Sequence, residues 1–457
     1  MTGLFPIVRG PSYRMSRDPS LIPESLRQRA QKVERDALDP VNLYNIHWYD
    51  RQGNLRRLLL PPELTGVEAN IIVLLGKDFP SGSHKVGPAY FTLVENELQG
   101  RLQPGMEIIG PSTGNFGIGT AYVATLKGYA SIIVMPEGMS AERYERIKRY
   151  RGKLDLTPGS ESDVNLVLDR VQAVYAPHPE RYLILGQFEL LQNYRFHRFV
   201  TGDAVRKAVQ GIGNGRVAAF VAAPGSAGTL AAGDEVKAYD PEARVVALEP
   251  YECSTLYDCG LGSHKIEGIG DKMVVLIHNL LTTDLIMLIH DQDCLDGLFL
   301  LEEWREELPR VCGIPSSVLP ALRGVFGISS LCNVLGAIKT ARYLQLGPRD
   351  NVVTVATDGI DRYYSVLQAQ HHLCNQDPEA VFQRIFRSKD LSGILEVDAY
   401  HRKRLFNQKA WEWKRRGYTD ELLEAMKHQD YWDEEYARIT DIDAAIEACA
   451  EPLLQGG

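Results

Sequence analysis

The sequence predicts an α/β protein with two parallel sheets, each covered by helices, and a helical appendage at its C-terminal end. Between residues 70 and 360, short runs rich in β-branched residues alternate with amphipathic helical patterns, as in NIIVLLG, ASIIVMP and NVVTVAT. The length of 457 residues favours two sheets over one. Residues 375–457 are helical in pattern, charged and aromatic, without strand–helix alternation.

Taken in order, the chain divides into four predicted segments. Residues 1–76 form an N-terminal segment that packs partly on the larger domain. Residues 77–190 form a smaller α/β domain and residues 191–374 a larger one. The stretch HLCNQDPEA then leads into the helical extension, residues 375–457. We expect this extension to pack on the α/β body or on a second subunit, because exposed aromatic clusters are usually covered. A separate regulatory domain is the alternative.

Composition narrows the class of protein. Hydrophobic residues make up 44% and charged residues 24%, as in soluble globular proteins. A net charge of -9 argues against a nucleic-acid surface, which needs clustered Lys and Arg. Seven scattered cysteines without a CxxC pair favour a reducing compartment and argue against disulfides or a metal site. No segment has the pattern of a signal peptide or a membrane span, so we expect a cytoplasmic protein.

The first unusual junction is IIGPSTGNFGIGTAYVATLKG, residues 108–128, where a strand runs into a helix. Free backbone N–H groups at such a helix start attract an anion. Ser112, Thr113 and Asn115 add side-chain donors. The junction could therefore hold a carboxylate, although a simply capped helix explains it equally well.

The second junction is FVAAPGSAGTLAAGDEV, residues 220–236. Gly225 and Gly228 let the backbone approach a ligand closely, and Ser226 and Thr229 offer hydroxyl groups. This is the form of a phosphate-binding loop. It matches neither GxGxxG nor GxxxxGK[ST], which argues against a dinucleotide or a nucleoside triphosphate.

A single lysine, Lys85, lies in SGSHKVGPAYFTL between a turn of small residues and a predicted helix. A lysine near a phosphate loop and a carboxylate-binding turn could form an imine with pyridoxal phosphate (PLP). The alternative is an ordinary surface lysine.

With these motifs in place, the chain resembles the cysteine synthase group of fold-type II PLP enzymes, which includes cystathionine β-synthase and is tryptophan-synthase-β-like in fold. The resemblance covers roughly residues 75–366, and eight segments follow the family's order. They are FPSGSHKVG, PSTGNFGIGTAYVA, MPEGMSAERYERIKRY, YLILGQF with HRFVTGDAV, PGSAGTLAAG, KIEGIGD, GISSLCNVLGAIK and TDGIDRYYS. Together they identify the family far more specifically than any one of them.

The resemblance implies a role for each site residue. Lys85 would hold PLP and move the substrate α-proton, Asn115 would contact the ring hydroxyl, and Ser329 would face the pyridine nitrogen. A neutral serine there makes the ring a weaker electron sink, which suits β-elimination through an aminoacrylate. The phosphate would be bound by Gly225, Ser226, Ala227, Gly228 and Thr229, and the substrate carboxylate by Ser112, Thr113, Gly114, Phe116 and Gln187.

Several positions depart from the family's pattern. Phe116 stands where the family has a threonine, and Leu331 ends a segment that usually ends in glycine. Asp358 lies in the TDGIDRYYS segment and could compete with Ser329 for the ring nitrogen. The GIG segment continues with DKMV rather than small residues. His84 is similar to the GSHK of tryptophan synthase β chains, whose catalytic Glu is missing from PSTGNFG.

The resemblance therefore implies a PLP-dependent transferase or lyase. We expect β-replacement on a serine or cysteine derivative through an α-aminoacrylate, in a homodimer that binds a small amino-acid substrate. One alternative is a β-elimination lyase or ammonia-lyase that gives a 2-oxo acid. A tryptophan-synthase-β-like enzyme is another, and a non-catalytic homologue is disfavoured by the intact Lys85 and phosphate loop.

Overall fold

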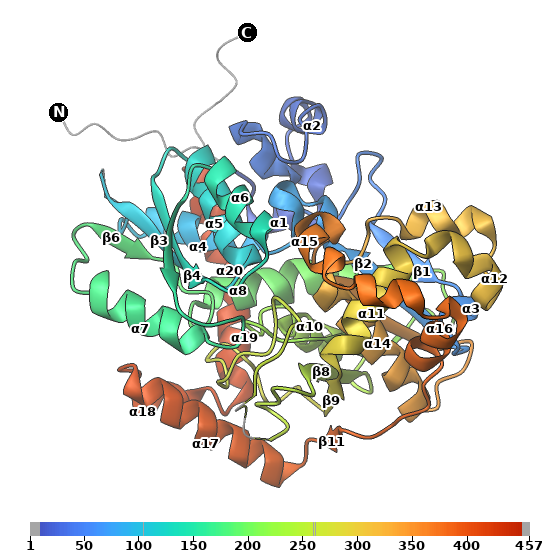
Figure 1. Ribbon diagram of the computed structural model, residues 1–457. Coiled ribbons are helices and arrows are strands. Elements are labelled where there is room, and N and C mark those ends of the chain that lie inside the picture. The colour runs from blue at the N-terminus through green and yellow to red at the C-terminus, as the bar shows by residue number, and fades with distance from the viewer. Residues whose placement is uncertain (1–9, 104, 259, 261, 450–457) are drawn as a thin grey trace.

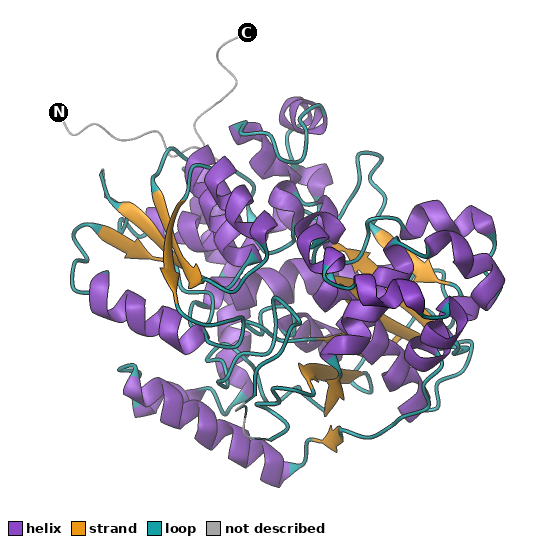
Figure 2. Cartoon of the chain, viewed as in Figure 1, coloured by secondary structure: helices purple, strands orange, loops and turns teal. Residues whose placement is uncertain are grey.

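The computed structural model describes residues 10–449 except 104, 259 and 261, and it contains two separate β-sheets. The larger sheet has the strand order β1-β2-β10-β7-β8-β9-β11 and the smaller one the order β5-β4-β3-β6. In Figure 2 the two sheets lie apart, with helices between and around them. The predicted two-sheet α/β fold with a helical C-terminal region is confirmed.

The larger sheet combines a parallel centre with antiparallel edges. Its strands are β1 (Arg57–Leu60), β2 (Asn70–Leu75), β7 (Val217–Ala222), β8 (Arg244–Pro250), β9 (Leu285–Ile289), β10 (Asn351–Ala356) and β11 (Ile394–Glu396). Strands β2, β10, β7, β8 and β9 run parallel, whereas β1 and β11 pair antiparallel at the edges. Every residue of β10 is buried, as expected for a central strand covered on both faces.

Strand β11 lies within the segment that the sequence predicts to be only helical. Its three residues pair with β9, and their side chains are half-buried or exposed. Three residues are too few to show the apolar periodicity by which a strand is recognised in the sequence. Within residues 375–449, the regular elements of the C-terminal extension are therefore helices apart from this one edge strand.

The smaller sheet is entirely parallel. Its strands are β3 (Glu107–Pro111), β4 (Ser131–Pro136), β5 (Lys153–Thr157) and β6 (Tyr182–Ile184). The helices that follow or flank these strands are α4 (Val86–Leu98), α5 (Asn115–Leu126), α6 (Ala141–Arg149) and α7 (Val164–Val174). Helices α4 and α5 pack closely on each other, so the helix after Lys85 contacts the helix that begins at Asn115.

The remaining helices cover the larger sheet and form the two ends of the chain. They are α1 (Tyr13–Arg17), α2 (Glu24–Gln31), α3 (Pro62–Thr65), α8 (Leu191–Phe196), α9 (Gly202–Ala208), α10 (Ala231–Tyr239), α11 (Asp291–Glu302), α12 (Leu308–Cys312), α13 (Leu319–Leu322), α14 (Ile328–Tyr343), α15 (Tyr364–Gln368), α16 (Pro378–Phe386), α17 (Ala399–Arg415), α18 (Asp420–Ala425), α19 (Gln429–Ala437) and α20 (Ile439–Ala448). Within the described residues, none of these helices combines the length and apolarity needed to cross a membrane.

The C-terminal extension packs on the α/β body of its own chain. In Figure 1, α17 and α18 run along the lower side of the view, and α19 and α20 continue between the two sheets. Trp413 Nε1 donates to the carbonyl oxygen of Val274 at 2.9 Å. At the far end, the Asp443 carboxylate accepts the backbone N–H of Tyr13 at 2.6 Å. The extension thereby contacts both the 274 region of the body and the first described helix, α1.

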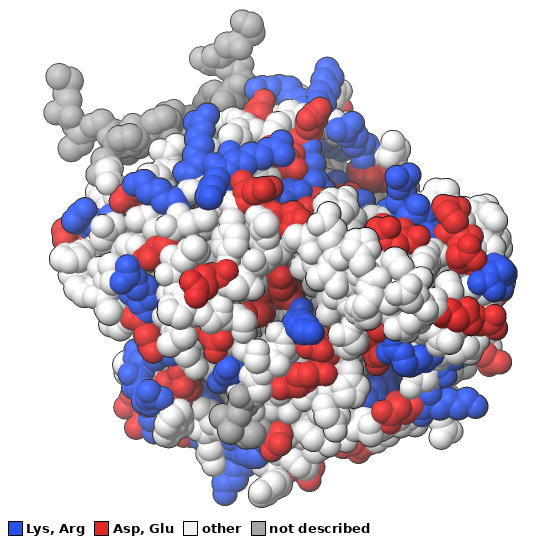
Figure 3. Space-filling view, in the orientation of Figure 1, with Lys and Arg blue, Asp and Glu red and all other residues white. Residues whose placement is uncertain are grey.

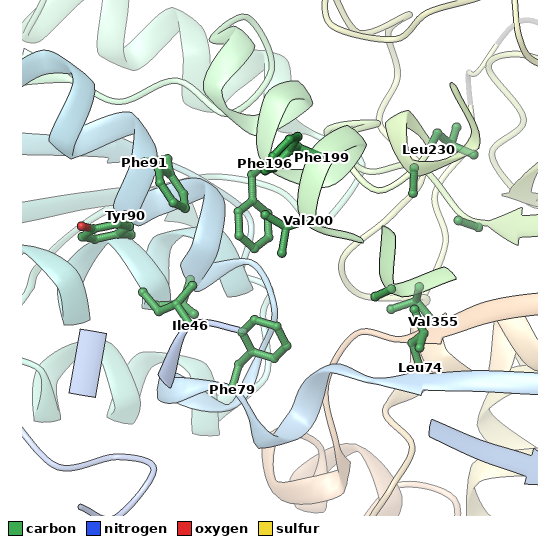
Figure 4. Close-up of a cluster of buried hydrophobic side chains, with 14 of the residues drawn as sticks. Ile46, Leu74, Phe79, Tyr90, Phe91, Phe196, Phe199, Val200, Leu230 and Val355 are labelled. Atoms are coloured by element: carbon green, nitrogen blue, oxygen red, sulfur yellow. The ribbon is translucent and has the colours of Figure 1, made fainter. Parts of the chain in front are cut away.

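A hydrophobic cluster holds the segment that carries Lys85. Figure 4 shows Phe79, just before the lysine turn, together with Phe91 on α4 and Phe196 on α8. The rings of Phe91 and Phe196 lie 5.7 Å apart, and all three side chains are buried. Fixed packing on both sides of the turn limits the positions that the Lys85 backbone can take.

Over the outer face seen in Figure 3, charges of both signs are interspersed.

Candidate active site

Three of the site segments meet because they leave neighbouring strands of the larger sheet in the same direction, whereas the carboxylate loop follows β3 of the smaller sheet. Strands β2, β10 and β7 are adjacent and parallel, so their carboxyl ends share one edge of the larger sheet. The Lys85 turn follows β2, the Asp358 segment follows β10, and the phosphate loop follows β7. Ligands of open α/β sheets bind at this edge.

Lys85 lies immediately before α4 and is half-buried. Its Nζ lies 3.5 Å from the position that a Cβ on Gly225 would take, so the amine contacts the phosphate loop. Burial lowers the pKa of Lys85; the Arg143 charge adds to this effect, and the Glu161 and Asp271 carboxyl groups oppose it. A lowered pKa increases the fraction of neutral amine, which is the form that attacks a carbonyl carbon.

The phosphate loop is close-packed against its neighbours. A Cβ on Gly225 would lie 2.5 Å from the Gly268 carbonyl oxygen, and a Cβ on Gly228 would collide with the Asn193 side chain. Asn193 Nδ2 donates to Ser226 Oγ at 2.9 Å. His84 Nε2 and Thr229 Oγ1 share a hydrogen bond of 3.1 Å, which links the residue before Lys85 to this loop.

Ala227 adopts a left-handed backbone conformation, with φ of 60°. An L-residue with a Cβ is strained there, whereas glycine is not. Ser81, in the turn before Lys85, has a similar φ of 62°. Strained residues of this kind concentrate at functional sites.

The predicted carboxylate loop is held by hydrogen bonds to Ser112. Ser112 Oγ accepts the backbone N–H groups of Gly114 and Gly117 at 3.0 and 2.9 Å, and Gln187 Nε2 lies 3.5 Å away. The Gln187 Oε1 atom is buried and has no hydrogen-bond partner among the described residues. Phe116 is only 1% exposed. Ser112 and Gln187 therefore lie together, as the sequence predicts.

Thr113 has a partner that the sequence does not suggest. Its hydroxyl donates to Glu161, and its carbonyl oxygen accepts from Arg143 Nη1 at 2.9 Å. Burial raises the pKa of Glu161 to about 7, although the Arg143 charge opposes this effect. Arg143 also pairs with Glu267 at 3.1 Å. The hydroxyl of Thr113 is thus engaged by Glu161.

Asp271 is a second acidic group that sequence reasoning did not assign to the site. Burial raises its pKa to about 8, with a further contribution from the Glu161 charge, while Lys85 opposes it. The only signal in the sequence is the DKMV stretch after GIG, where the family has small residues. Arg143, Glu161 and Asp271 together place more ionisable groups around Lys85 than the motifs indicate.

Asn115 and Ser329 lie in the first turns of two helices, α5 and α14, at the same site. Asn115 Nδ2 donates to Asp358 Oδ2 at 2.6 Å, and its Oδ1 accepts from Arg362 Nε at 2.7 Å. Ser329 lies in the first turn of α14 and is buried. Its Oγ lies 3.8 Å from the position that a Cβ on Gly268 would take, and Gly268 in turn contacts Gly225.

These residues fit PLP. The loop around Gly225 and Gly228 is a cradle that a Cβ would fill, and the Lys85 amine lies next to it. Buried oxygen atoms without a hydrogen-bond partner among the described residues line the surrounding segments; they are Ser81 Oγ, Gln187 Oε1 and Asp358 Oδ1. The site thus combines a loop suited to phosphate, a lysine with a lowered pKa and buried polar atoms without partners. This combination is typical of two-sheet α/β enzymes that carry PLP.

The model of the pyridoxal-phosphate dependent enzyme family matches residues 62–303, and the chain belongs to this family. It is 31% identical to a cysteine synthase of Staphylococcus aureus over 298 residues, which cover 65% of this chain and 88% of that protein. A probable cysteine synthase of Bacillus subtilis is 32% identical, over 63% of this chain and 85% of that protein.

Solved structures give the same result for the fold. O-Acetylserine sulfhydrylase isoform 3 from Entamoeba histolytica is similar with a TM-score of 0.59 and 26% identity, over 72% of this chain and 92% of that one. The predictions of a fold-type II fold, of PLP as the cofactor and of an enzyme are thereby confirmed.

Proposed function

We propose that this enzyme catalyses a PLP-dependent β-replacement on a serine or cysteine derivative, through an α-aminoacrylate. One observation carries the proposal: the Lys85 amine, with its lowered pKa, lies against the phosphate loop at Gly225. The relatives named cysteine synthase support the same class of reaction.

Bound PLP supplies the electron sink that stabilises negative charge at the substrate α-carbon. Lys85 Nζ would hold the cofactor, and its neutral form, which burial favours, would take the substrate α-proton. Backbone N–H groups at the start of α5, with Gln187, orient the substrate carboxylate. Ser329 presents a neutral hydroxyl, which leaves the ring a moderate electron sink.

The individual assignments follow the motifs. Asn115 binds the ring hydroxyl. The phosphate is bound by Gly225, Ser226, Ala227, Gly228 and Thr229, and the substrate is bound by Ser112, Thr113, Gly114, Phe116 and Gln187. Thr113 contributes through its backbone, because its hydroxyl donates to Glu161.

We also propose that the enzyme is a cytoplasmic homodimer that acts on a free amino acid. Light scattering coupled to gel filtration tests the assembly: the expected mass is twice the 51.1 kDa of one chain. A mass of one chain at all concentrations would contradict the dimer and leave the reaction unaffected.

The test of the reaction is a donor panel. Purified enzyme is mixed with O-acetylserine, O-phosphoserine, serine or cysteine, with and without sulfide. The true donor is expected to give an α-aminoacrylate absorbance that decays when the nucleophile is added. Release of a 2-oxo acid at an unchanged rate with every nucleophile would instead identify a β-elimination lyase.

The assignment of Lys85 has its own test. Borohydride reduction of the yellow holoenzyme should attach the cofactor to Lys85, as mapped by peptide mass spectrometry. Lys85→Ala should abolish the adduct, and Lys77→Ala, in the same loop, should leave it intact. An adduct on another lysine would overturn the assignment.

A further inference from the structure

We propose that Asp358 and Arg362 are positioning residues that hold the side-chain amide of Asn115 in one orientation, leaving one of its N–H groups for the ring hydroxyl of PLP. This inference rests on the proposed function, which assigns Asn115 to that hydroxyl. Neither Asp358 nor Arg362 has a part in the reaction described above.

Both ends of the Asn115 amide are held by charged partners. Asp358 Oδ2 accepts from Nδ2 at 2.6 Å, and Arg362 Nε donates to Oδ1 at 2.7 Å. A carboxylate can only accept and a guanidinium can only donate, so the reversed amide would lose both hydrogen bonds. An amide nitrogen carries two N–H groups, and Asp358 uses one of them. The second remains for a ligand.

The two charged partners are themselves immobilised. Asp358 and Arg362 are both 0% exposed. Tyr363 OH donates to Asp358 Oδ2 at 2.7 Å, and Arg362 Nη2 donates to the carbonyl oxygen of Ser81 in the lysine turn. Charge-assisted hydrogen bonds between buried groups are short and directional, so they restrict the amide strongly.

The backbone of Asp358 also reaches the start of α14. Its carbonyl oxygen accepts the Gly327 N–H and the Ser330 hydroxyl, both at 3.1 Å. These residues flank Ser329. The segment after β10 therefore links the lysine turn, the Asn115 helix and the Ser329 helix, which are the parts that must be aligned on one cofactor.

This geometry bears on whether Asp358 takes the place of Ser329 at the ring nitrogen. Asp358 Oδ2 is occupied by Asn115 and Tyr363. The Oδ1 atom has no hydrogen-bond partner among the described residues, but it lies beside Gly327, where a Cβ on that glycine would collide with it. A carboxylate held in this way favours a role through Asn115 over direct contact with the nitrogen.

The experiment compares Asp358→Asn with Asp361→Asn in the PLP-loaded enzyme without substrate. An asparagine at 358 can donate or accept, so only Arg362 still opposes the reversed orientation of the Asn115 amide. Loss of one charge-assisted hydrogen bond should change the ratio of the two cofactor absorbance bands, which report the proton on the ring hydroxyl, by about tenfold. The pH at which this ratio titrates should shift as well.

Asp361→Asn is the matched control. It removes the same charge three residues along, where the carboxylate pairs with Arg35 and Arg146 and touches only Nη1 of Arg362. It should leave the band ratio and its titration unchanged, even if it lowers the melting temperature of the apoenzyme.

A double-mutant cycle separates positioning from simple stabilisation. If Asp358 acts through Asn115, Asp358→Asn should have no further spectral effect in an Asn115→Ala background. An unchanged spectrum in Asp358→Asn, or an equal change in both backgrounds, would overturn the proposal. Should that variant fail to fold, Tyr363→Phe removes the other hydrogen bond to Oδ2; a smaller shift in the same direction supports the proposal, and no shift contradicts it.

A wild-type protein without any cofactor band would refute the proposed function, which lies upstream of this inference. Failure of the proposed function and failure of the positioning role of Asp358 therefore give different results.

Discussion

Gly228 shows how a single position can decide cofactor binding. A Cβ there would collide with the Asn193 amide, which itself donates to Ser226. Gly228→Asp adds both this collision and a negative charge facing a phosphate. We expect the affinity for PLP to fall by about a hundredfold or more, since the loss exceeds one charge-assisted hydrogen bond. Fluorescence titration of the apoenzyme measures it.

The control is Gly347→Asp, because a Cβ at Gly347 meets only the Asp350 carboxylate, at 3.9 Å. Both variants should keep the wild-type circular dichroism spectrum. Unchanged PLP affinity in Gly228→Asp would mean that the phosphate binds elsewhere.

Phe116 is the position at which the carboxylate loop departs most from its family. A threonine there offers a hydroxyl, and one charge-assisted hydrogen bond corresponds to about tenfold or more in kcat/KM. We therefore expect Phe116→Thr to raise kcat/KM for O-acetylserine by about tenfold. Because Phe116 is 1% exposed, truncation should also lower stability by about 3 kcal/mol.

Steady-state kinetics across the donor panel and urea unfolding separate the two effects. If kcat/KM falls for every donor together with stability, Phe116 is a core residue without influence on specificity.

At the scale of elements, the strand-to-helix loops combine strain with close packing. Ala227 has φ of 60° in the phosphate loop, which costs an L-residue about 1–2 kcal/mol. Ala227→Gly removes this strain and is expected to raise the free energy of unfolding by about 1 kcal/mol, after the larger backbone entropy of glycine is subtracted. Urea denaturation of the apoenzyme measures the change.

Ala231→Gly, in the first turn of α10 directly after this loop, is the matched control. Without strain to relieve, it should lower stability by about 0.5–1 kcal/mol. Equal losses in the two variants would show that the conformation at Ala227 carries no strain.

For the molecule as a whole, the C-terminal extension introduces a pH dependence of stability. Lys409 on α17 is buried and donates to the carbonyl oxygens of Leu276 and His278 at 3.0 and 2.5 Å. Burial lowers its pKa to about 7. The unfolded chain, with an ordinary lysine pKa near 10.4, therefore binds more protons than the folded chain between about pH 7 and pH 10.

Stability attributable to Lys409 must consequently rise with pH across that window, by up to about 4 kcal/mol. Below pH 7 the full cost of burying the charge is present. Urea unfolding of the wild type and of Lys409→Met at pH 7 and pH 9.5 tests this. The free energy of unfolding of the wild type should increase relative to that of the variant as the pH rises. A constant difference would show that Lys409 titrates normally in the folded state.

Much of the fold can be read from local patterns. The runs NIIVLLG, ASIIVMP and NVVTVAT form β2, β4 and β10, since continuous apolar runs are typical of strands buried on both faces. Strand β5 was missed because its side chains are mostly half-buried or exposed, as in an edge strand. Strand β9 was hidden in the long apolar stretch 273–291, where periodicity cannot separate strand from helix. The predicted domain boundaries stay predictions.

By itself, the sequence determined the class of fold and, through the family resemblance, the cofactor. It also predicted the lysine, the carboxylate loop and the phosphate loop, because each of these motifs consists of residues close together in the chain. Only the tertiary structure decided which segments meet. Strand β2 pairs with β10, so that Asn70 lies opposite Asn351, and this pairing brings Arg362 to the lysine turn. Asn115 follows β3 of the smaller sheet, so its contact with Asp358 depends on the packing of that sheet against the larger one. The contacts of Thr113 with Glu161 and of Lys409 with the 276–278 backbone arise in the same way. Such contacts join residues far apart in sequence, and their energies depend on burial and geometry that no local pattern encodes.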